Sequence, residues 1–348
     1  MKIAPHSDAL TFARARSGAR HRLILVSKYA GDAVTGVDLT AALGDGCDDP
    51  VTAYAAHGYE GLRRASSGAP VITVTLDALT LPVTLTASHI AVGTNFPEHA
   101  KESTVTDGPF LFPKEVEPTP FNAPIPAGNA LLDYEVELCF VALTDVDISK
   151  PVECMGIILC NDVTDRATLM RHIDPRNITS GKGFTTGKSA PAYLPVGNLF
   201  VIPRDLRAFI TGIELRLTRN GVVKQSARQS EAIWGVDQLL SETLKRQELR
   251  WDHRGQTVRL AVDAGVIPAR TGILAGTPEG TIFKGLNKSA IPLGLVDWVL
   301  GGWSKPVTHW IVERHIAQES HSKTYLQAGD RVCISVEHLG ELRNVIAA

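Results

Sequence analysis

The stretch Leu131-Leu132-Asp133-Tyr134-Glu135-Val136-Glu137-Leu138-Cys139-Phe140 alternates between acidic and apolar side chains. Successive side chains of a strand point to opposite faces, so the carboxylates of Asp133, Glu135 and Glu137 are expected to share one face. Like charges this close repel, and a fold keeps them only if the face is solvated or a cation lies there. Alone, the segment favours a half-buried strand with a solvated acidic face. The alternative is a divalent metal site held by Glu135 and Glu137.

Length and charge narrow the class of protein. At 348 residues the chain can bury one large domain and a smaller one. The formal net charge of -2 gives no electrostatic reason to expect a nucleic acid or an anionic membrane as partner. No apolar run approaches the roughly 20 residues that span a bilayer, and residues 1–20 contain no signal-peptide core. The sequence therefore predicts a cytoplasmic protein whose five widely spaced cysteines are reduced.

Strand-like segments dominate the chain, with runs of valine, isoleucine, leucine and aromatic residues. They are residues 21–28, 70–76, 130–142, 155–160, 199–202, 210–219 and 331–337. Apolar residues recur at helical spacing in residues 165–174 and 230–245, and Ser230 is expected to cap the second helix. Because few helices alternate with the strands, we expect a β-rich α+β fold rather than a doubly wound parallel sheet.

Two further divisions follow from composition. The Leu/Thr-rich residues 80–87 suggest a boundary between a small N-terminal α/β module, residues 1–87, and a larger domain, residues 88–348. Residues 285–322 contain three of the five tryptophans, and we call this segment the Trp-rich insertion. We expect it to be helical and to pack on the core or on a partner subunit. The alternative is that it lines or covers the mouth of an active site.

Six local patterns carry candidate functional residues, among them an H-x-x-E pair, His99 with Glu102. That spacing places both side chains on one face of a helical turn, where a carboxylate fixes the imidazole tautomer and raises its basicity. In chain order the six are Gly93-Thr94-Asn95-Phe96-Pro97-Glu98-His99-Ala100-Lys101-Glu102, Pro109-Phe110-Leu111-Phe112-Pro113-Lys114, the acidic strand, Asn161-Asp162-Val163-Thr164-Asp165-Arg166, Gly181-Lys182-Gly183-Phe184-Thr185-Thr186 and Gly276-Thr277-Pro278-Glu279-Gly280.

In order, spacing and neighbouring residues, these patterns resemble the fumarylacetoacetate hydrolase family. The resemblance covers about residues 88–348 apart from the Trp-rich insertion, and extends to the ending Gly329-Asp330-Arg331-Val332 and Leu339-Gly340-Glu341-Leu342-Arg343-Asn344. It implies a mixed β-sandwich roll as the catalytic domain, a homodimer, and Mg²⁺ or a similar ion bound by two glutamates and an aspartate. It also implies a small-molecule 2-oxo acid or dicarbonyl substrate.

The resemblance also implies roles for individual residues. The implied metal ligands are Glu135, Glu137 and Asp162, an all-carboxylate set that suits Mg²⁺, Mn²⁺ or Ca²⁺ better than zinc. The implied catalytic residues are His99 and Glu102, as a water-activating pair, and Lys182, whose ammonium would meet a substrate oxygen near the metal. The implied substrate contacts are Arg166, Thr277 and Phe96, and Lys114 is expected to be structural.

The chain departs from the family pattern at the substrate end. Family members usually continue the fourth pattern with Ala-Arg-Asp and then a polar residue, whereas here Asp165 precedes Arg166, Ala167 follows it and Leu169 takes the polar position. Phe96 stands where a tyrosine is frequent. Together with the Trp-rich insertion, these changes predict a substrate less polar than that of simple family members.

The leading functional hypothesis is hydrolytic cleavage of a carbon–carbon bond in an acylpyruvate or β-diketone through a metal-stabilised enolate, with water activated by His99 and Glu102. A 2-oxo acid decarboxylase, an isomerase or a hydratase would use the same residues, and none of these residues separates the four reactions. A non-catalytic binding or scaffold protein is a third class of answer.

Overall fold

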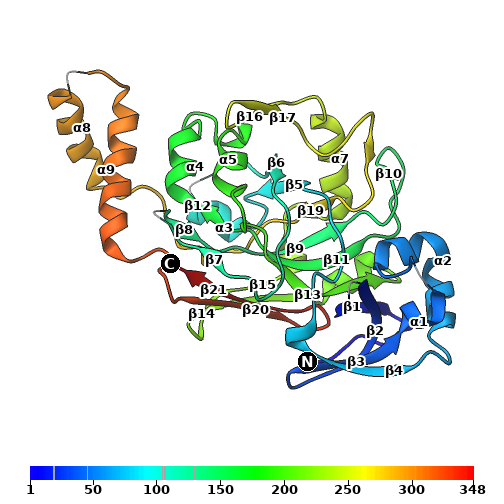
Figure 1. The fold of residues 1–348 in the computed structure, drawn as a ribbon. Helices are drawn as coiled ribbons and strands as arrows, with labels where there is room; N and C mark the ends of the chain where they lie inside the picture. The colour runs from blue at the N-terminus through cyan, green and yellow to red at the C-terminus, as the bar shows by residue number, and fades with distance from the viewer. Residues whose placement is uncertain (19, 45, 104, 106, 129, 302) are drawn as a thin grey trace.

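One large mixed sheet connects the N-terminal strands to the centre of the molecule (Figure 1). The computed structural model describes residues 1–348 except 19, 45, 104, 106, 129 and 302. The sheet has the order β4-β3-β2-β1-β13-β11-β9-β19-β5-β6. Its strands are β1 (Ala9–Ser17), β2 (Arg20–Ala30), β3 (Ala33–Asp38), β4 (Val71–Thr75), β5 (Ser88–Gly93), β6 (Phe110–Glu115), β9 (Val136–Val141), β11 (Gly156–Asn161), β13 (Val196–Pro203) and β19 (Gly272–Leu274).

A second sheet packs against the first and closes the roll. It has the order β15-β14-β20-β21-β7, formed by β7 (Ile125–Pro126), β14 (Glu214–Arg219), β15 (Val222–Arg228), β20 (Arg331–Val336) and β21 (Gly340–Ala347). Leu138 and Ile157 of the first sheet share one buried apolar cluster with Leu217 and Leu342 of the second. Burial of this shared apolar surface holds the two layers together. The predicted β-rich α+β fold with a mixed β-sandwich roll is confirmed.

Three short strand pairs complete the β-structure: β8 (Leu132–Asp133) with β12 (Thr164–Asp165), β10 (Val146–Asp147) with β18 (Val266–Ile267), and β16 (Trp251–His253) with β17 (Gln256–Val258). The helices are α1 (Leu39–Leu43), α2 (Pro50–Ala65), α3 (Pro97–Glu102), α4 (Arg166–His172), α5 (Phe184–Lys188), α6 (Leu206–Thr211), α7 (Val236–Arg246), α8 (Ala290–Leu300) and α9 (Val307–Ser322). In the part of the chain that is described, no helix is both long enough and apolar enough to span a bilayer.

Two local predictions are wrong. Ser230 does not cap the helix that follows it, because residues 229–231 form a short 3₁₀ turn and α7 begins only after Gly235. The predicted strand at 210–219 starts too early, because Ile210 and Thr211 end α6 and the strand begins at Glu214. In both cases apolar spacing located the buried residues without locating the break in backbone conformation.

The first 87 residues continue the large sheet. Strand β1 pairs antiparallel with β13, with Leu10 opposite Ile202. Helices α1 and α2 lie beside this end of the sheet (Figure 1). The Asp49 carboxylate forms salt bridges with Arg14 and with Arg270. Arg270 lies in the distant connection between β18 and β19. The proposed boundary at residues 87 and 88 therefore does not interrupt the sheet.

The Trp-rich insertion forms a helical hairpin, α8 followed by α9, that projects from the body of the molecule (Figure 1). The two helices approach closely at Gly294, where a Cβ atom would lie 2.6 Å from the Cα atom of Ile311. Arg314 and Asp297 join them by a salt bridge of 2.6 Å. The α8–α9 hairpin is thus a packed unit on one side of the roll.

Candidate active site

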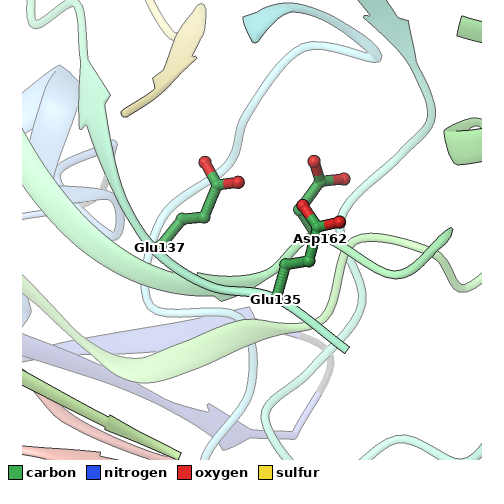
Figure 2. Close-up of side chains that lie close together, drawn as sticks. All are labelled: Glu135, Glu137 and Asp162. Carbon is green, nitrogen blue, oxygen red and sulfur yellow. The ribbon is translucent and has the colours of Figure 1, made fainter. Parts of the chain in front are cut away.

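Three carboxylates converge where β9 begins and β11 ends. One oxygen from each of Glu135, Glu137 and Asp162 lies within 4.8 Å of the others (Figure 2). The alternation of β9 brings the two glutamates together. Antiparallel pairing with β11 brings Asp162 beside them, and its amide donates to the Glu135 carbonyl at 2.9 Å. Their exposed fractions are only 4%, 1% and 1%, so the predicted solvated acidic face is wrong.

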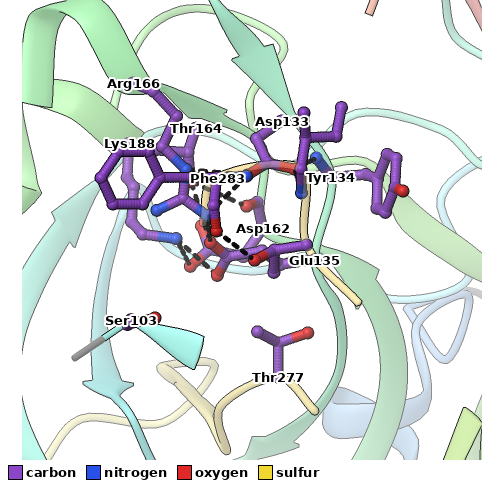
Figure 3. Close-up of polar contacts among 12 residues, drawn as sticks. Ser103, Asp133, Tyr134, Glu135, Asp162, Thr164, Arg166, Lys188, Thr277 and Phe283 are labelled. Atoms are coloured by element: carbon purple, nitrogen blue, oxygen red, sulfur yellow. Dashed lines mark hydrogen bonds and ion pairs between the residues drawn. The ribbon is translucent and has the colours of Figure 1, made fainter. Parts of the chain in front are cut away.

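Two buried lysines neutralise part of this cluster, and Figure 3 shows one of them, Lys188. The ammonium of Lys188 lies 2.7 Å from Glu135 Oε2 and 2.8 Å from Asp162 Oδ2. Lys114 donates to Asp162 Oδ1 and to the backbone carbonyl of Lys188, both at 2.5 Å. Because an unpaired charge in this interior is costly, these contacts fix both lysines and both carboxylates in place.

Arg166 bridges two acidic residues of the quoted stretch (Figure 3). Its Nη2 donates to Glu135 Oε1 at 2.6 Å and its Nε donates to Asp133 Oδ2 at 2.9 Å. Asp133 also accepts hydrogen bonds from the amides of Ile282 and Phe283. Asp133 therefore has its own hydrogen-bond partners and is not one of the three converging carboxylates. Its bond to Arg166 holds the guanidinium toward them.

The carboxylates differ in their charge balance. Burial works against ionisation of Glu135, but Lys188 and Arg166 outweigh it and lower its pKa to about 2. Burial, reinforced by Asp162 and Glu135, raises the pKa of Glu137 well above its usual value. Within the described part of the chain, Glu137 accepts a hydrogen bond from the Gly276 amide at 2.7 Å and forms no ion pair. An all-oxygen donor set short of positive charge at Glu137 fits a hard divalent cation.

His99 and Glu102 lie on the predicted helical turn, α3. His99 is buried, and its Nδ1 lies 3.5 Å from Glu102 Oε2. Burial lowers the pKa of His99 to about 4, so the expected rise in its basicity is wrong, and its imidazole is neutral at pH 7, the state that can accept a proton. Glu102 also accepts hydrogen bonds from the amide of Gly280 and the hydroxyl of Thr281. These bonds tie α3 to the Gly276–Gly280 loop.

A cavity of about 520 Å³ opens beside these groups. His99, Glu135, Arg166 and Lys188 line it together with Thr277. Of the residues that the sequence proposed for substrate and catalysis, the structure thus brings His99, Arg166 and Thr277 to one cavity. Glu102 lies next to His99 but is not among the residues that line the cavity.

Two of these residues are already engaged. The hydroxyl of Thr277 donates to the Val136 carbonyl at 3.0 Å and accepts from the Gln225 amide at 2.9 Å. Arg166 faces the cavity while bound to two carboxylates. Phe96, in contrast, is buried in the main apolar core and is not among the residues that line the cavity. Its lack of a hydroxyl therefore suits a packing position.

Lys182 is exposed, and the structure does not bring it to the carboxylates. The two glycines that flank it are required by the backbone conformation. Gly181 and Gly183 have φ angles of 71° and 85°, and a Cβ on Gly183 would lie 2.6 Å from the carbonyl carbon of His172. Glycine on either side of a lysine is thus explained without a catalytic role.

Lys188, and not Lys182, lies at the carboxylates where a lysine was expected. It ends α5, and a Cβ on the preceding Gly187 would lie 2.8 Å from Leu169 Cβ, so α5 packs tightly on α4. This close approach carries Lys188 inward. The available sequence signal was the second Gly-Lys pair, six residues after the first.

Comparisons with known proteins identify the family and the fold. The sequence model described as fumarylacetoacetate (FAA) hydrolase C-terminal matches residues 88–347, which is more than half of the chain. The chain belongs to the fumarylacetoacetate hydrolase family. No curated protein sequence matches it.

Solved structures of fumarylacetoacetate hydrolase type share the fold. A fumarylacetoacetate hydrolase from psychrophilic Exiguobacterium antarcticum is 21% identical, with a TM-score of 0.59 over 97% of this chain and 99% of that chain. A 5-carboxymethyl-2-hydroxymuconate delta-isomerase from Mycobacterium smegmatis is 19% identical, with a TM-score of 0.56 over 97% and 99%. A 2-hydroxyhepta-2,4-diene-1,7-dioate isomerase from Mycobacterium marinum is 20% identical, with a TM-score of 0.56 over 97% and 98%.

Proposed function

We propose that the chain is a metal-dependent enzyme that hydrolyses a carbon–carbon bond in an acylpyruvate or β-diketone. One observation carries the proposal: three buried carboxylates converge, and one of them, Glu135, lines a cavity that a neutral His99 also lines. A metal site and a proton acceptor that face the same cavity are the two parts that this chemistry needs.

Glu135, Glu137 and Asp162 would hold the ion, with Mg²⁺ as the first choice and Mn²⁺ or Ca²⁺ as substitutes. When bound, such an ion acts as a Lewis acid that stabilises negative charge on substrate oxygens, an effect worth several kcal/mol. Lys188, already at Glu135 and Asp162, takes the role of placing an ammonium at a substrate oxygen. Arg166 adds a second fixed positive charge at the same end of the cavity.

His99 supplies the base. Its neutral imidazole takes a proton from water as the water oxygen adds to the distal carbonyl carbon of the substrate. The bond between that carbon and the central carbon then breaks, and the central carbon receives a proton. The products are a carboxylic acid and a shorter ketone or 2-oxo acid. Glu102 positions His99, and its own bonds to the Gly276–Gly280 loop keep α3 in place.

Isomerisation is the second candidate, because two of the solved structures of the same fold are named as isomerases. It would use His99 to move a proton between substrate atoms without adding water. Decarboxylation or hydration of a 2-oxo acid would draw on the same groups. The homodimer and the cytoplasmic location stay predictions.

A product screen separates these reactions. The purified protein is incubated with Mg²⁺ and, in turn, an acylpyruvate, a β-diketone and oxaloacetate, and the products are weighed by mass spectrometry. Hydrolysis gives two fragments whose summed mass exceeds that of the substrate by one water. Isomerisation leaves the mass unchanged, and decarboxylation removes carbon dioxide. Either of these as the main outcome contradicts the hydrolase proposal.

A further inference from the structure

The cavity is polar at one end only. Its polar groups from the candidate site are the neutral His99 and the charged Glu135, Arg166 and Lys188. Away from them the lining is largely apolar, and includes Leu169, Met170, Phe283, Ile291, Ile311 and Val312. A cavity of about 520 Å³ lies in the range that holds drug-sized ligands, so it offers more room than a bare 2-oxo acid fills.

The α8–α9 hairpin builds one wall of this apolar part. Ile291 of α8 and Ile311 and Val312 of α9 line the cavity, across from Leu169 and Met170 of α4. The Trp-rich insertion therefore meets the alternative expectation that it lines the mouth of an active site.

The hairpin is fastened to α4 by two kinds of contact. Arg171 of α4 and Glu313 of α9 form a two-pronged salt bridge of 2.7 and 2.9 Å. Met170 of α4 and Ile316 of α9 belong to one small buried apolar cluster. These contacts hold the α8–α9 hairpin beside α4, and both elements line the cavity, whose apolar part we call the channel.

Among the described residues that line the outer part of the cavity, none offers an unpaired fixed charge to a second acidic group. Among the described residues that line it, Arg171 is the fixed cation, and Glu313 already pairs with it. His309 is in contact with Lys305 at 3.2 Å. Ile291, in contrast, is 44% exposed and has apolar surface that a ligand would cover.

We propose that the substrate carries a long alkyl or aryl substituent, uncharged at its far end, that lies between α4 and the α8–α9 hairpin. Its 2-oxo acid end lies at the carboxylates, Lys188 and Arg166. This inference rests on the proposed function for the identity of the polar end. The apolar channel, built by α4 and the hairpin, selects for the tail.

Binding measurements test the channel separately from catalysis. Dissociation constants of pyruvate, 2-oxohexanoate and 2-oxodecanoate are measured by calorimetry on the whole protein with Mg²⁺ present. Each buried methylene contributes about 0.8 kcal/mol, so the dissociation constant should fall about fourfold per methylene until the channel is filled. A 2-oxo acid of equal length that ends in a second carboxylate should bind more weakly than its methyl-ended counterpart.

A matched pair of variants on α8 locates the effect. Ile291 and Leu293 are 44% and 42% exposed, but only Ile291 lines the cavity. Ile291→Asp should remove most of the chain-length dependence, while Leu293→Asp should leave it unchanged. Because both positions are exposed on the hairpin, both variants are expected to fold, and equal melting temperatures confirm this.

The outcomes separate the two proposals. Dissociation constants that do not depend on tail length, or equal behaviour of the two variants, overturn the channel. Length-dependent binding without cleavage of any acylpyruvate supports the channel and overturns the proposed hydrolysis. Cleavage of short and long acylpyruvates with equal kcat/KM, by contrast, supports the hydrolysis and contradicts the channel.

Discussion

The two ends of the cavity are built on different physical principles. At the inner end, Glu135, Asp162, Lys114 and Lys188 are paired charge by charge, with distances between 2.5 and 2.8 Å. At the outer end, α4 and the α8–α9 hairpin offer apolar surface that is partly exposed. Buried charges demand defined partners, whereas apolar contact depends mainly on the area covered. The inner end should therefore be intolerant of single changes, and the outer end should respond gradually.

The largest effect is expected at the carboxylate that lacks an ion pair. Glu137→Gln keeps the shape of the side chain and an acceptor for the Gly276 amide, but removes a charged ligand. Loss of several kcal/mol of electrostatic stabilisation should lower kcat/KM by about 10³-fold or more. The Mg²⁺-dependent rise in melting temperature should vanish with it. A variant that keeps both would remove Glu137 from the metal site.

His99→Gln tests the base at the inner end without disturbing the carboxylates. Since a positioned base contributes about 10²–10⁴-fold, kcat should fall by that factor. Titration of Mg²⁺ by melting temperature should match the wild type, because His99 is not one of the three converging ligands. Equal loss of catalysis and of metal binding in a folded variant contradicts the separation of roles.

The two Gly-Lys pairs give an internal control for buried charge. Lys188→Met leaves Glu135 and Asp162 short of a cation and should lower the free energy of unfolding by about 3–5 kcal/mol without metal. The measurement is chemical denaturation in the presence of a chelator.

Lys182→Met is the matched variant and should change the free energy of unfolding by less than about 0.5 kcal/mol, because Lys182 is exposed. Its kcat/KM should also equal that of the wild type. If the two lysine variants had equal effects, Lys182 would again be the candidate catalytic lysine.

A small effect on stability is expected at the outer end. Arg171→Ala breaks a half-exposed salt bridge to Glu313. Such pairs contribute about 0.2–1 kcal/mol, so the free energy of unfolding should fall by no more than that. Because the bridge fastens α9 to α4, KM for long-chain substrates should rise a few-fold while KM for short ones stays constant. A cycle with Glu313→Ala and the double variant checks that the effect belongs to the pair.

Local patterns in the sequence were sufficient for much of the site. Alternation along the acidic stretch predicted that Glu135 and Glu137 share a face. The spacing of His99 and Glu102 predicted the helical turn that α3 forms. Each of these depends on backbone periodicity over a few residues, which the sequence displays directly.

The errors have a common cause. Glycines flanking Lys182 were taken as a sign of a functional lysine, whereas they satisfy positive φ angles and close packing against His172. Judged from its own residues the acidic strand was expected to be solvated, whereas the two cations that pair with it, Arg166 and Lys188, come from α4 and α5. Such partners are distant in sequence and cannot be assigned from spacing.

By itself the sequence determined the β-rich fold and the shared face of Glu135 and Glu137, because alternation is a local property, and its ordered patterns indicated the family, which implied Asp162 as the third carboxylate. Only the tertiary structure decided which lysine meets those carboxylates, that Phe96 belongs to the core, and that the Trp-rich insertion forms a wall of the cavity. The physical reason is that burial and charge pairing depend on which surfaces meet, and those surfaces come from distant parts of the chain.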